Sequence, residues 1–351
     1  MSSRAWRMAT SLAILVVILI LLAALELGSR LFLEGAAIQG ARREVTVRIP
    51  QGSSLDDISR ILYGEGLIEH PRLFALTARF LGSDTKLQAG TIRLALGQSL
   101  VELIRALSVA KAVGIPVTLR EGLTSRQVAE ILARELGVDS SAFMHAVFDS
   151  RLLLRLNVDA PSFEGYLFPD TYFFTGLESA DQIVERMVTN FRMQLPANTN
   201  ERLAALGLSL NEMVALASIV EWECMIPSEA RVIASVYHNR LRKGMLLQAD
   251  PTVGYALGKG PSRLFLSDLQ VDSPYNTYRY AGLPPGAINN PGRRSMEAAL
   301  NPTTTPYLFF VAQGDGTHAF TSNYSDHLQA KQKLDELRRA PALEADAGVQ
   351  G

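Results

Sequence analysis

The N-terminal segment from Met8 to Leu25 contains no charged residue and is mostly aliphatic. A helix of this length crosses the hydrocarbon core of a bilayer, where backbone N–H and C=O groups must be paired within the helix. Arg4 and Arg7 precede the segment, so the positive-inside rule places the N-terminus in the cytoplasm and the rest of the chain outside it. The first part of the chain is therefore predicted to contain a cytoplasmic N-terminus, a single transmembrane helix and a connector (residues 1–7, 8–28 and 29–43).

A cleaved signal peptide is the alternative for this segment. The apolar run is long for the hydrophobic region of a signal peptide, and no small-x-small cleavage site follows it. The anchor is therefore favoured. In both cases the remainder of the chain is exported.

Three copies of a strand, glycine turn and helix follow the connector. Each copy has a short strand of alternating pattern, a glycine, a Ser or Thr and then a short amphipathic helix. Ser54, Ser99 and Thr124 are predicted N-caps, because their hydroxyl oxygens can accept hydrogen bonds from otherwise unpaired helix N–H groups. We interpret region 44–137 as small α+β units that bind glycans or proteins, or only pack. The strands are expected at residues 45–50, 91–96 and 117–121.

Region 138–340 is predicted to be rich in helix, with long loops. Ser209 and Glu212 have the spacing of a capping box and indicate the beginning of a helix. After Met245 the helical period fades, and the one clear β-hairpin joins "TPYLFFVAQ" to "THAFTS". The predicted fold class is α+β, ending in a polar helix and a frayed tail at 341–351. Further helices are expected at residues 140–149, 179–194 and 228–243.

The composition excludes several classes of function. Lys and Arg number 34 and Asp and Glu 35, so the charge balance does not favour nucleic-acid binding. The single cysteine, Cys224, excludes an internal disulfide and a cysteine-based metal cluster. The five histidines show no metal-ligand spacing, and no phosphate loop or nucleophile elbow is present. No metal, cofactor or nucleic-acid partner is expected.

Glu221 ends the apolar run that begins at Leu216. Burying an ionised carboxylate is costly, so either Glu221 reaches water at the rim of the core or burial raises its pKa. An acid that is neutral near pH 7 can protonate the leaving oxygen of a glycosidic bond. From the pattern alone, the rim position is the more common one. Glu223 lies two residues further on, faces elsewhere on a helix and is expected at the surface.

Seven segments, in order, carry a family resemblance. They are "EGYLFPDTY" (164–172), "LASIVE" (216–221), "IASVYHNRL" (233–241), "LQADPTVGYALG" (247–258), "SPYNTY" (273–278), "GLPPGAINNPG" (282–292) and "ALNP" (299–302). Together they resemble the YceG-like endolytic murein transglycosylases, which are bacterial inner-membrane enzymes. The resemblance implies a LysM-like subdomain at 44–137 and a YceG-like catalytic domain at 138–340.

The resemblance also implies a site. The glutamate that closes "LASIVE", Glu221, is the implied catalytic residue. Two departures are visible: Trp222 stands where the family commonly has lysine, and Cys224–Pro227 differs from the usual glycine-containing sequence. Either change can alter the rate and the pH optimum. Amide, hydroxyl, carboxyl and tyrosine side chains suit sugars, and the expected substrate-binding residues are Ser218, Glu223, Gln248, Asp250, Tyr275, Asn276, Tyr278 and Asn290.

The implied reaction is the non-hydrolytic cleavage of the MurNAc–GlcNAc bond of nascent peptidoglycan. Glu221 would protonate the glycosidic oxygen and then accept the proton of the MurNAc 6-hydroxyl as that oxygen attacks C1. The product is a 1,6-anhydro-MurNAc end, and glycan elongation is terminated. One carboxylate is then sufficient where hydrolases use two.

The implied location is the inner membrane, single-pass, with the catalytic domain in the periplasm. The expected partners are peptidoglycan glycan strands, the membrane and peptidoglycan synthases such as penicillin-binding proteins. Two alternatives remain open. One is a muramidase that uses water, and the other is a catalytically inactive glycan-binding scaffold of the wall-synthesis machinery.

Overall fold

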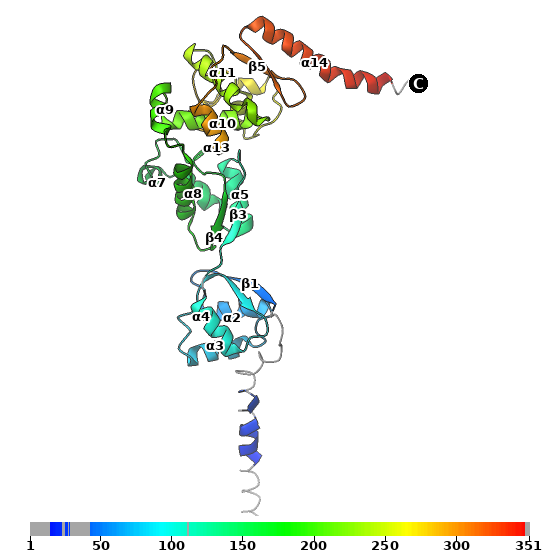
Figure 1. Ribbon diagram of the computed structural model, residues 1–351. Coiled ribbons are helices and arrows are strands. Elements are labelled where there is room, and N and C mark those ends of the chain that lie inside the picture. Colours follow the sequence, from blue (N-terminus) through cyan, green and yellow to red (C-terminus); the bar gives the residue numbers. More distant parts are fainter. Residues whose placement is uncertain (1–14, 23–24, 27, 29–42, 111, 348–351) are drawn as a thin grey trace, which may run out of the picture. The chain divides into compact units, whose positions relative to one another are not determined.

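The computed structural model describes residues 15–22, 25–26, 28, 43–110 and 112–347, with the backbone alone at 335 and 337–347 (Figure 1). The chain divides into two compact units. The first comprises Met1–Pro116 with Phe173–Glu178, and the second Val117–Tyr172 with Ser179–Gly351. The predicted domain boundaries at 44–137 and 138–340 remain predictions.

The predicted transmembrane helix at 8–28 lies largely outside the described residues, as does the connector at 29–43; residues 15–22 are helical. Within the part of the chain that the structure describes, no single helix is both long and apolar enough to cross a membrane. Helices α9 (Thr199–Leu206) and α10 (Leu210–Glu223) pass that test only as a pair, bent by 89°. α10 is buried in protein from Met213 to Val220.

The first unit packs helices on a two-stranded antiparallel sheet. The strands pair in a register that sets Val47 opposite Ile92. Both side chains lie in one apolar cluster with Leu62 and Leu103, and all four are almost completely buried. The elements are β1 (Glu44–Ile49), α2 (Leu55–Gly64), α3 (Pro71–Phe80), β2 (Gly90–Ala95) and α4 (Leu100–Val109).

The three predicted N-caps are confirmed. Ser54, Ser99 and Thr124 each accept a hydrogen bond from the backbone N–H three residues on, in a complete capping box. The strands of the first two copies pair with each other, whereas β3 (Ile115–Thr118) pairs with β4 (Thr171–Phe174). The same local pattern thus recurs three times, but the third copy takes a different partner.

The second unit is a helical body built around α10, which contacts α11, α12 and α13 (Figure 1). The hairpin of β5 and β6 packs against α14. Besides α9 and α10, its helices and strands are α5 (Ser125–Leu136), α6 (Ser140–Phe148), α7 (Ser150–Arg155), α8 (Ala180–Gln194), α11 (Ala230–Arg242), α12 (Asp250–Ala256), α13 (Arg293–Leu300), β5 (Phe309–Ala312), β6 (His318–Thr321) and α14 (Tyr324–Ala347).

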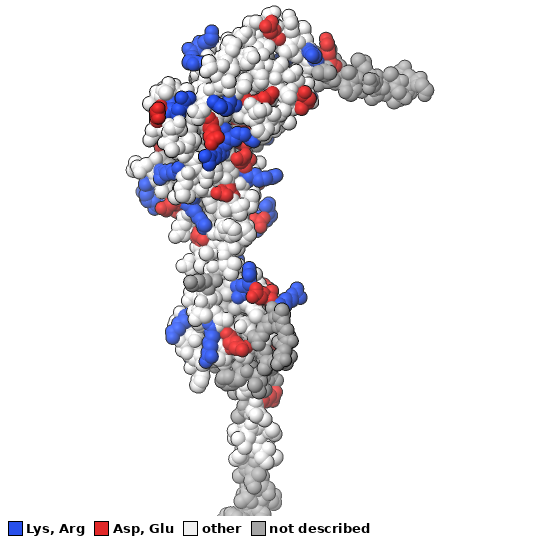
Figure 2. Space-filling model, viewed as in Figure 1, with Lys and Arg blue, Asp and Glu red and all other residues white. Residues whose placement is uncertain are grey.

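The fold class is α+β as predicted, with small sheets and a confirmed hairpin. Helices α12 and α13 were not predicted, because they are short and lie among Gly, Pro and Asn residues that obscure the helical period. The tail at 341–351 stays a prediction; within it, α14 continues to Ala347. Basic and acidic side chains are interspersed on the visible face of the second unit (Figure 2).

Candidate active site

Helix α10 carries the candidate acids at its C-terminal end. Ser209 and Glu212 form the capping box that begins it, and every residue from Met213 to Val220 is buried. The burial spans all sides of the helix, so the surrounding helices fix its position and rotation. Its last turn emerges from the core and presents Glu221, Trp222 and Glu223, each half-buried.

Glu221 is held by the beginning of α13. One of its oxygens, Oε2, accepts hydrogen bonds from the backbone N–H of Gly292 at 3.1 Å and from the hydroxyl of Ser295 at 2.6 Å. Gly292 is the N-cap of α13 and has no side chain to cap it. The carboxylate therefore supplies the acceptor that this helix N-terminus lacks, a favourable place for a negative charge.

A second carboxylate, Glu121, lies beside this contact. Burial raises its pKa, the charge of Glu221 raises it further, and Arg294 opposes both effects from 4.0 Å. The Glu121 side chain lies directly against Gly292, where a Cβ would meet its carboxyl group, so any larger residue at 292 would displace the Glu121 side chain. Glu121 was not predicted to lie near Glu221, because it is far from α10 along the chain.

Trp222 is hydrogen-bonded to the loop that follows Glu121. Its indole Nε1 donates a hydrogen bond to the carbonyl oxygen of Gly122 at 2.9 Å. The same loop is tied to the 282–292 segment, because Gly122 N–H donates to Asn290 O at 2.9 Å. The residue that departs from the common family lysine therefore fastens the loop that carries Glu121.

Glu223 lies in a different environment. The hydroxyl group of Tyr237, a fully buried residue of α11, donates a hydrogen bond to Glu223 Oε1 at 3.0 Å. Burial raises the pKa of Glu223 to about 7, and the negative charge of Asp250 contributes to this rise. The hydrogen bond from Tyr237 and the positive charge of Arg240 act in the opposite direction. A carboxyl group with this pKa exchanges its proton near neutral pH, as a general acid must. The predicted surface role of Glu223 is therefore wrong.

Polar groups from three chain segments surround Glu223. Asp250 accepts a hydrogen bond from the Tyr278 hydroxyl at 2.5 Å. Arg240 donates to the carbonyl oxygen of Leu247 at 2.7 Å, and its Nη1 lies 3.4 Å from Gln248 Oε1. Gln248 adopts a φ of 48°, in the left-handed region that a residue with a side chain rarely occupies. Gln248 and Asp250 are both exposed.

A cavity of about 920 Å³ opens beside this group, and Asp250 and Tyr278 form part of its wall. Its volume lies at the upper end of the range for small-molecule sites. Of the predicted substrate-binding residues, Glu223, Gln248, Asp250 and Tyr278 thus lie together, next to an open space.

The other predicted binding residues lie elsewhere. Ser218, Asn276 and Asn290 are at most 1 % exposed. Ser218 Oγ accepts the Ile288 N–H, and Asn276 Nδ2 donates to Leu269 O and Val271 O. Tyr275 packs against Tyr255, with ring centroids 4.9 Å apart. The three buried residues hold loops together and are out of reach of a substrate, so the prediction that they bind it is wrong.

Asn290 joins a sealed polar network that contains another acid. Glu164, only 6 % exposed, accepts hydrogen bonds from Ser125 N–H at 2.9 Å and from Asn290 Nδ2 at 3.2 Å. Burial raises the pKa of Glu164 to about 7, and hydrogen bonds from Ser125 and Tyr255 oppose the shift. No lining residue of the cavity beside Glu223 belongs to this network.

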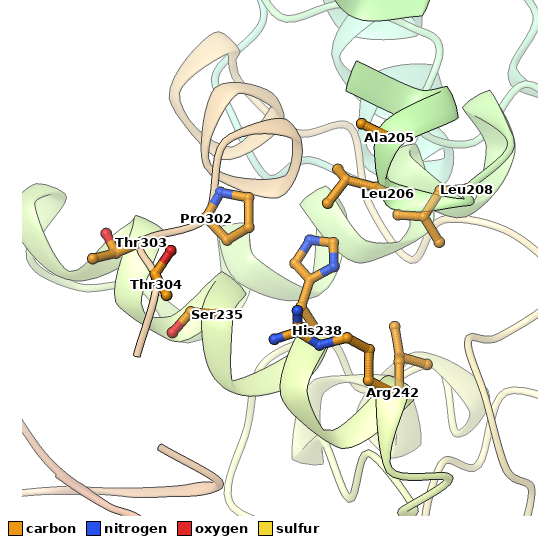
Figure 3. Close-up of a pocket in the computed structure, with 10 residues that line it drawn as sticks. Ala205, Leu206, Leu208, Ser235, His238, Arg242, Pro302, Thr303 and Thr304 are labelled. Atoms are coloured by element: carbon orange, nitrogen blue, oxygen red, sulfur yellow. The ribbon is translucent and has the colours of Figure 1, made fainter. Parts of the chain in front are cut away.

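A second pocket, of about 180 Å³, lies against α9 and α11. Figure 3 shows the His238 ring pointing toward Leu206 and Pro302. His238 Nε2 donates to the carbonyl oxygen of Ala299 at 2.8 Å, and burial lowers the His238 pKa. No carboxylate lines this pocket. Among the described residues, no group of three or more His, Cys, Asp or Glu side chains could hold a metal ion.

Known proteins resemble this chain over most of its length. A family model described as the YceG-like family matches residues 47–333. A Bacillus subtilis protein named endolytic murein transglycosylase is 34 % identical over 309 residues, covering 84 % of this chain and 85 % of that protein.

A Streptococcus pneumoniae protein of the same name is 28 % identical over 319 residues, which are 82 % of this chain and 58 % of the relative. A solved structure of a putative YceG-like protein from Listeria monocytogenes has a TM-score of 0.58 and 32 % identity. The match covers 82 % of this chain and 98 % of that one.

Proposed function

Because the chain belongs to the YceG-like family, we propose that it is a lytic transglycosylase that cleaves glycan strands of peptidoglycan with Glu223 as its proton donor. The observation that carries the assignment is Glu223 itself. It combines a pKa of about 7 with a position next to a cavity lined by Asp250 and Tyr278.

The reaction proposed is internal and non-hydrolytic. Glu223 gives its proton to the oxygen between MurNAc and GlcNAc, and the bond from that oxygen to MurNAc C1 breaks. The 6-hydroxyl oxygen of MurNAc then bonds to C1 of the same sugar, and the Glu223 carboxylate takes the proton of that hydroxyl. The product has a 1,6-anhydro end. Asp250 adds a negative charge near Glu223, which raises the pKa of Glu223 and favours the positive charge that develops at C1.

Glu221 is the acid that the sequence resemblance implied, and the contacts support a different role for it. Both donors at its Oε2 belong to the beginning of α13. We propose that Glu221 positions the 282–292 segment and α13 against α10, while Glu223 performs the proton transfers. Glu221 remains the alternative donor.

The experiment compares Glu223→Gln with Glu221→Gln in the full-length protein, using uncrosslinked nascent glycan strands. We expect Glu223→Gln to fold and to lose at least about a hundredfold in kcat, because it cannot donate a proton. Glu221→Gln keeps the hydrogen-bond acceptor and should retain most activity. The reverse order would assign the acid to Glu221.

Mass spectrometry of the wild-type products tests the reaction type. Anhydro ends support the transglycosylase, products heavier by one water indicate a muramidase, and binding without cleavage indicates a scaffold. Any result other than anhydro ends overturns the proposal.

We further propose that the chain is a single-pass protein of the inner membrane, with its catalytic unit in the periplasm. The support is the uncharged Met8–Leu25 segment, in which residues 15–22 are helical, apolar and exposed. Tethering would confine cleavage to new strands near the bilayer, in keeping with a role in terminating elongation beside peptidoglycan synthases. The LysM-like nature of residues 44–137 belongs to the same proposal.

A further inference from the structure

The cavity beside Glu223 is lined by basic and apolar side chains as well as by the polar groups that suit a sugar. Besides Asp250 and Tyr278, its wall consists of two basic and four apolar side chains: Arg263, Lys331, Leu264, Phe265, Leu266 and Leu269. Arg263 and Lys331 make no ion pair or hydrogen bond within the described residues, and both are exposed. The one acid in the wall, Asp250, is hydrogen-bonded to Tyr278. The two positive charges are therefore available to a ligand.

The loop that carries Arg263 is held in shape. Asp268 accepts hydrogen bonds from the Phe265 N–H and from Lys259 Nζ, both at 2.9 Å. Asn276 Nδ2 fixes the next part of the loop, because it donates hydrogen bonds to the carbonyl oxygens of Leu269 and Val271 at 2.9 and 2.8 Å. Phe265 and Leu266 are nevertheless 66 % and 85 % exposed. A fixed loop with exposed apolar side chains is typical of a binding surface.

A neutral glycan matches this wall poorly. In a strand that carries its peptides, the lactyl carboxyl of each MurNAc is part of an amide, so the sugars offer no charge to Arg263 and Lys331. Three of the four apolar side chains of the wall are leucines, which form no hydrogen bond with sugar hydroxyl groups. A short acidic peptide fits both features, since its carboxylates can pair with the cations and its methyl groups can contact the apolar wall. In peptidoglycan such a peptide is attached to the lactyl group of MurNAc.

We propose that this cavity binds the acidic stem peptide of the glycan strand, so that the enzyme selects strands that still carry their peptides. This inference rests on the proposed function and names a specificity site for it. Arg263 and Lys331 pair with peptide carboxylates, while Leu264, Phe265 and Leu266 contact the peptide's apolar side chains.

The test uses two substrates with the same glycan: uncrosslinked strands with stem peptides, and the same strands after an amidase has removed them. The second substrate keeps one lactyl carboxylate on each MurNAc, so both strands are negatively charged and a preference between them reports the peptide itself. For the full-length protein, kcat/KM is measured on both by mass spectrometry of the products. We expect the wild type to prefer peptide-bearing strands. The double variant Arg263→Gln, Lys331→Gln should lower that preference by about tenfold, because two ion pairs with the peptide are lost.

Lys333→Gln is the matched control, since Lys333 is an exposed lysine of α14 that does not line the cavity. It should keep the wild-type preference. If the wild type cleaves both substrates equally and the double variant leaves the ratio unchanged, the inference is overturned while the proposed function stands.

A binding measurement separates the two claims further. In a Glu223→Gln background, calorimetry with a soluble disaccharide–peptide should show weaker binding for the double variant and a clear loss of affinity with added salt. Equal affinity with and without the two charges would refute the inference, whether or not the wild type cleaves. Absence of cleavage by the wild type on either substrate would refute the proposed function alone.

Discussion

The networks around Glu164 and Glu223 contain carboxyl groups with the same pKa of about 7, and in both cases burial is the first cause. Glu164 is sealed: it is 6 % exposed and accepts hydrogen bonds from Ser125 and Asn290. Glu223 is half-buried and accepts a hydrogen bond from Tyr237. It also interacts electrostatically with Asp250, which lines the cavity. A raised pKa therefore does not identify a catalytic acid unless substrate can also reach the group.

Glu221 extends the comparison. It lies two residues before Glu223 on the same helix, yet its partners are the N-cap and a hydroxyl group of α13. Two carboxylates in one helical turn thus have different tasks, because the side chain of each meets a different neighbouring element.

The largest expected effect comes from a substitution at Gly165, whose backbone N–H donates a hydrogen bond to Asn290 Oδ1 at 2.9 Å and so joins the network around Glu164. This residue has a φ of 89°, and a Cβ there would lie 2.4 Å from Ala287 Cβ and 2.6 Å from Val214 Cγ1. Gly165→Ala should lower the free energy of unfolding by about 2–5 kcal/mol, from backbone strain and overpacking together. Denaturant unfolding measures the loss.

Gly207→Ala is the control for Gly165→Ala. Its φ is 67°, but nothing lies within 4 Å of the added Cβ, so only the conformational cost of about 1 kcal/mol should appear. Equal losses for the two variants would show that close packing at Gly165 does not matter.

The next effect concerns pH and the free energy of unfolding. The pKa of Glu164 rises from 4.5 to about 7 on folding, so between these values the folded protein binds more protons than the unfolded chain. Stability should therefore fall as pH rises from 4.5 to 7, by up to about 3 kcal/mol, and level off above. Glu164→Gln should remove the contribution of Glu164 to this slope.

Denaturant unfolding at pH 5 and pH 8 compares the two proteins. Glu223→Gln should flatten the profile to a similar extent, because burial raises the pKa of Glu223 to the same value. An unchanged slope in Glu164→Gln would contradict a neutral, sealed Glu164.

The smallest expected effects shift the pH dependence of the proposed cleavage in opposite directions. A general acid must be protonated, so activity should fall as pH rises through the pKa of Glu223. Tyr237→Phe removes a hydrogen bond that lowers this pKa, and Asp250→Asn removes a charge that raises it. The alkaline limb of kcat should move up in the first variant and down in the second, by about one pH unit.

Profiles of kcat against pH, recorded with the wild type in parallel, measure these shifts. Movement of both variants in the same direction, or of neither, would mean that another group controls the limb.

Local signals made much of the fold predictable. The hydroxyl caps at Ser54, Ser99, Thr124 and Ser209 were found because a capping box lies within four residues of sequence. The hairpin of β5 and β6 was found for a similar reason, since a tight turn separates its strands. In contrast, the pairing of β3 with β4 depends on residues more than fifty positions apart, which no local pattern specifies.

The site was predictable only in part. The pattern drew attention to the end of α10 and to Gln248, Asp250 and Tyr278, which do lie together. It directed attention to Glu221 rather than Glu223, because hydrophobic periodicity shows which face of a helix is apolar but not which residues of other elements meet the last turn. Glu121 was missed for the same reason.

The order of residues alone determined where helices begin, which segments are apolar and where acids stand at the end of a buried helix, since these depend on neighbours along the chain. Only the tertiary structure decided what each acid does. It brought Tyr237 and Asp250 to Glu223, the beginning of α13 to Glu221 and a closed set of donors to Glu164. A carboxyl group's proton affinity and access are set by solvent and charges around it in space, and those come from distant parts of the chain.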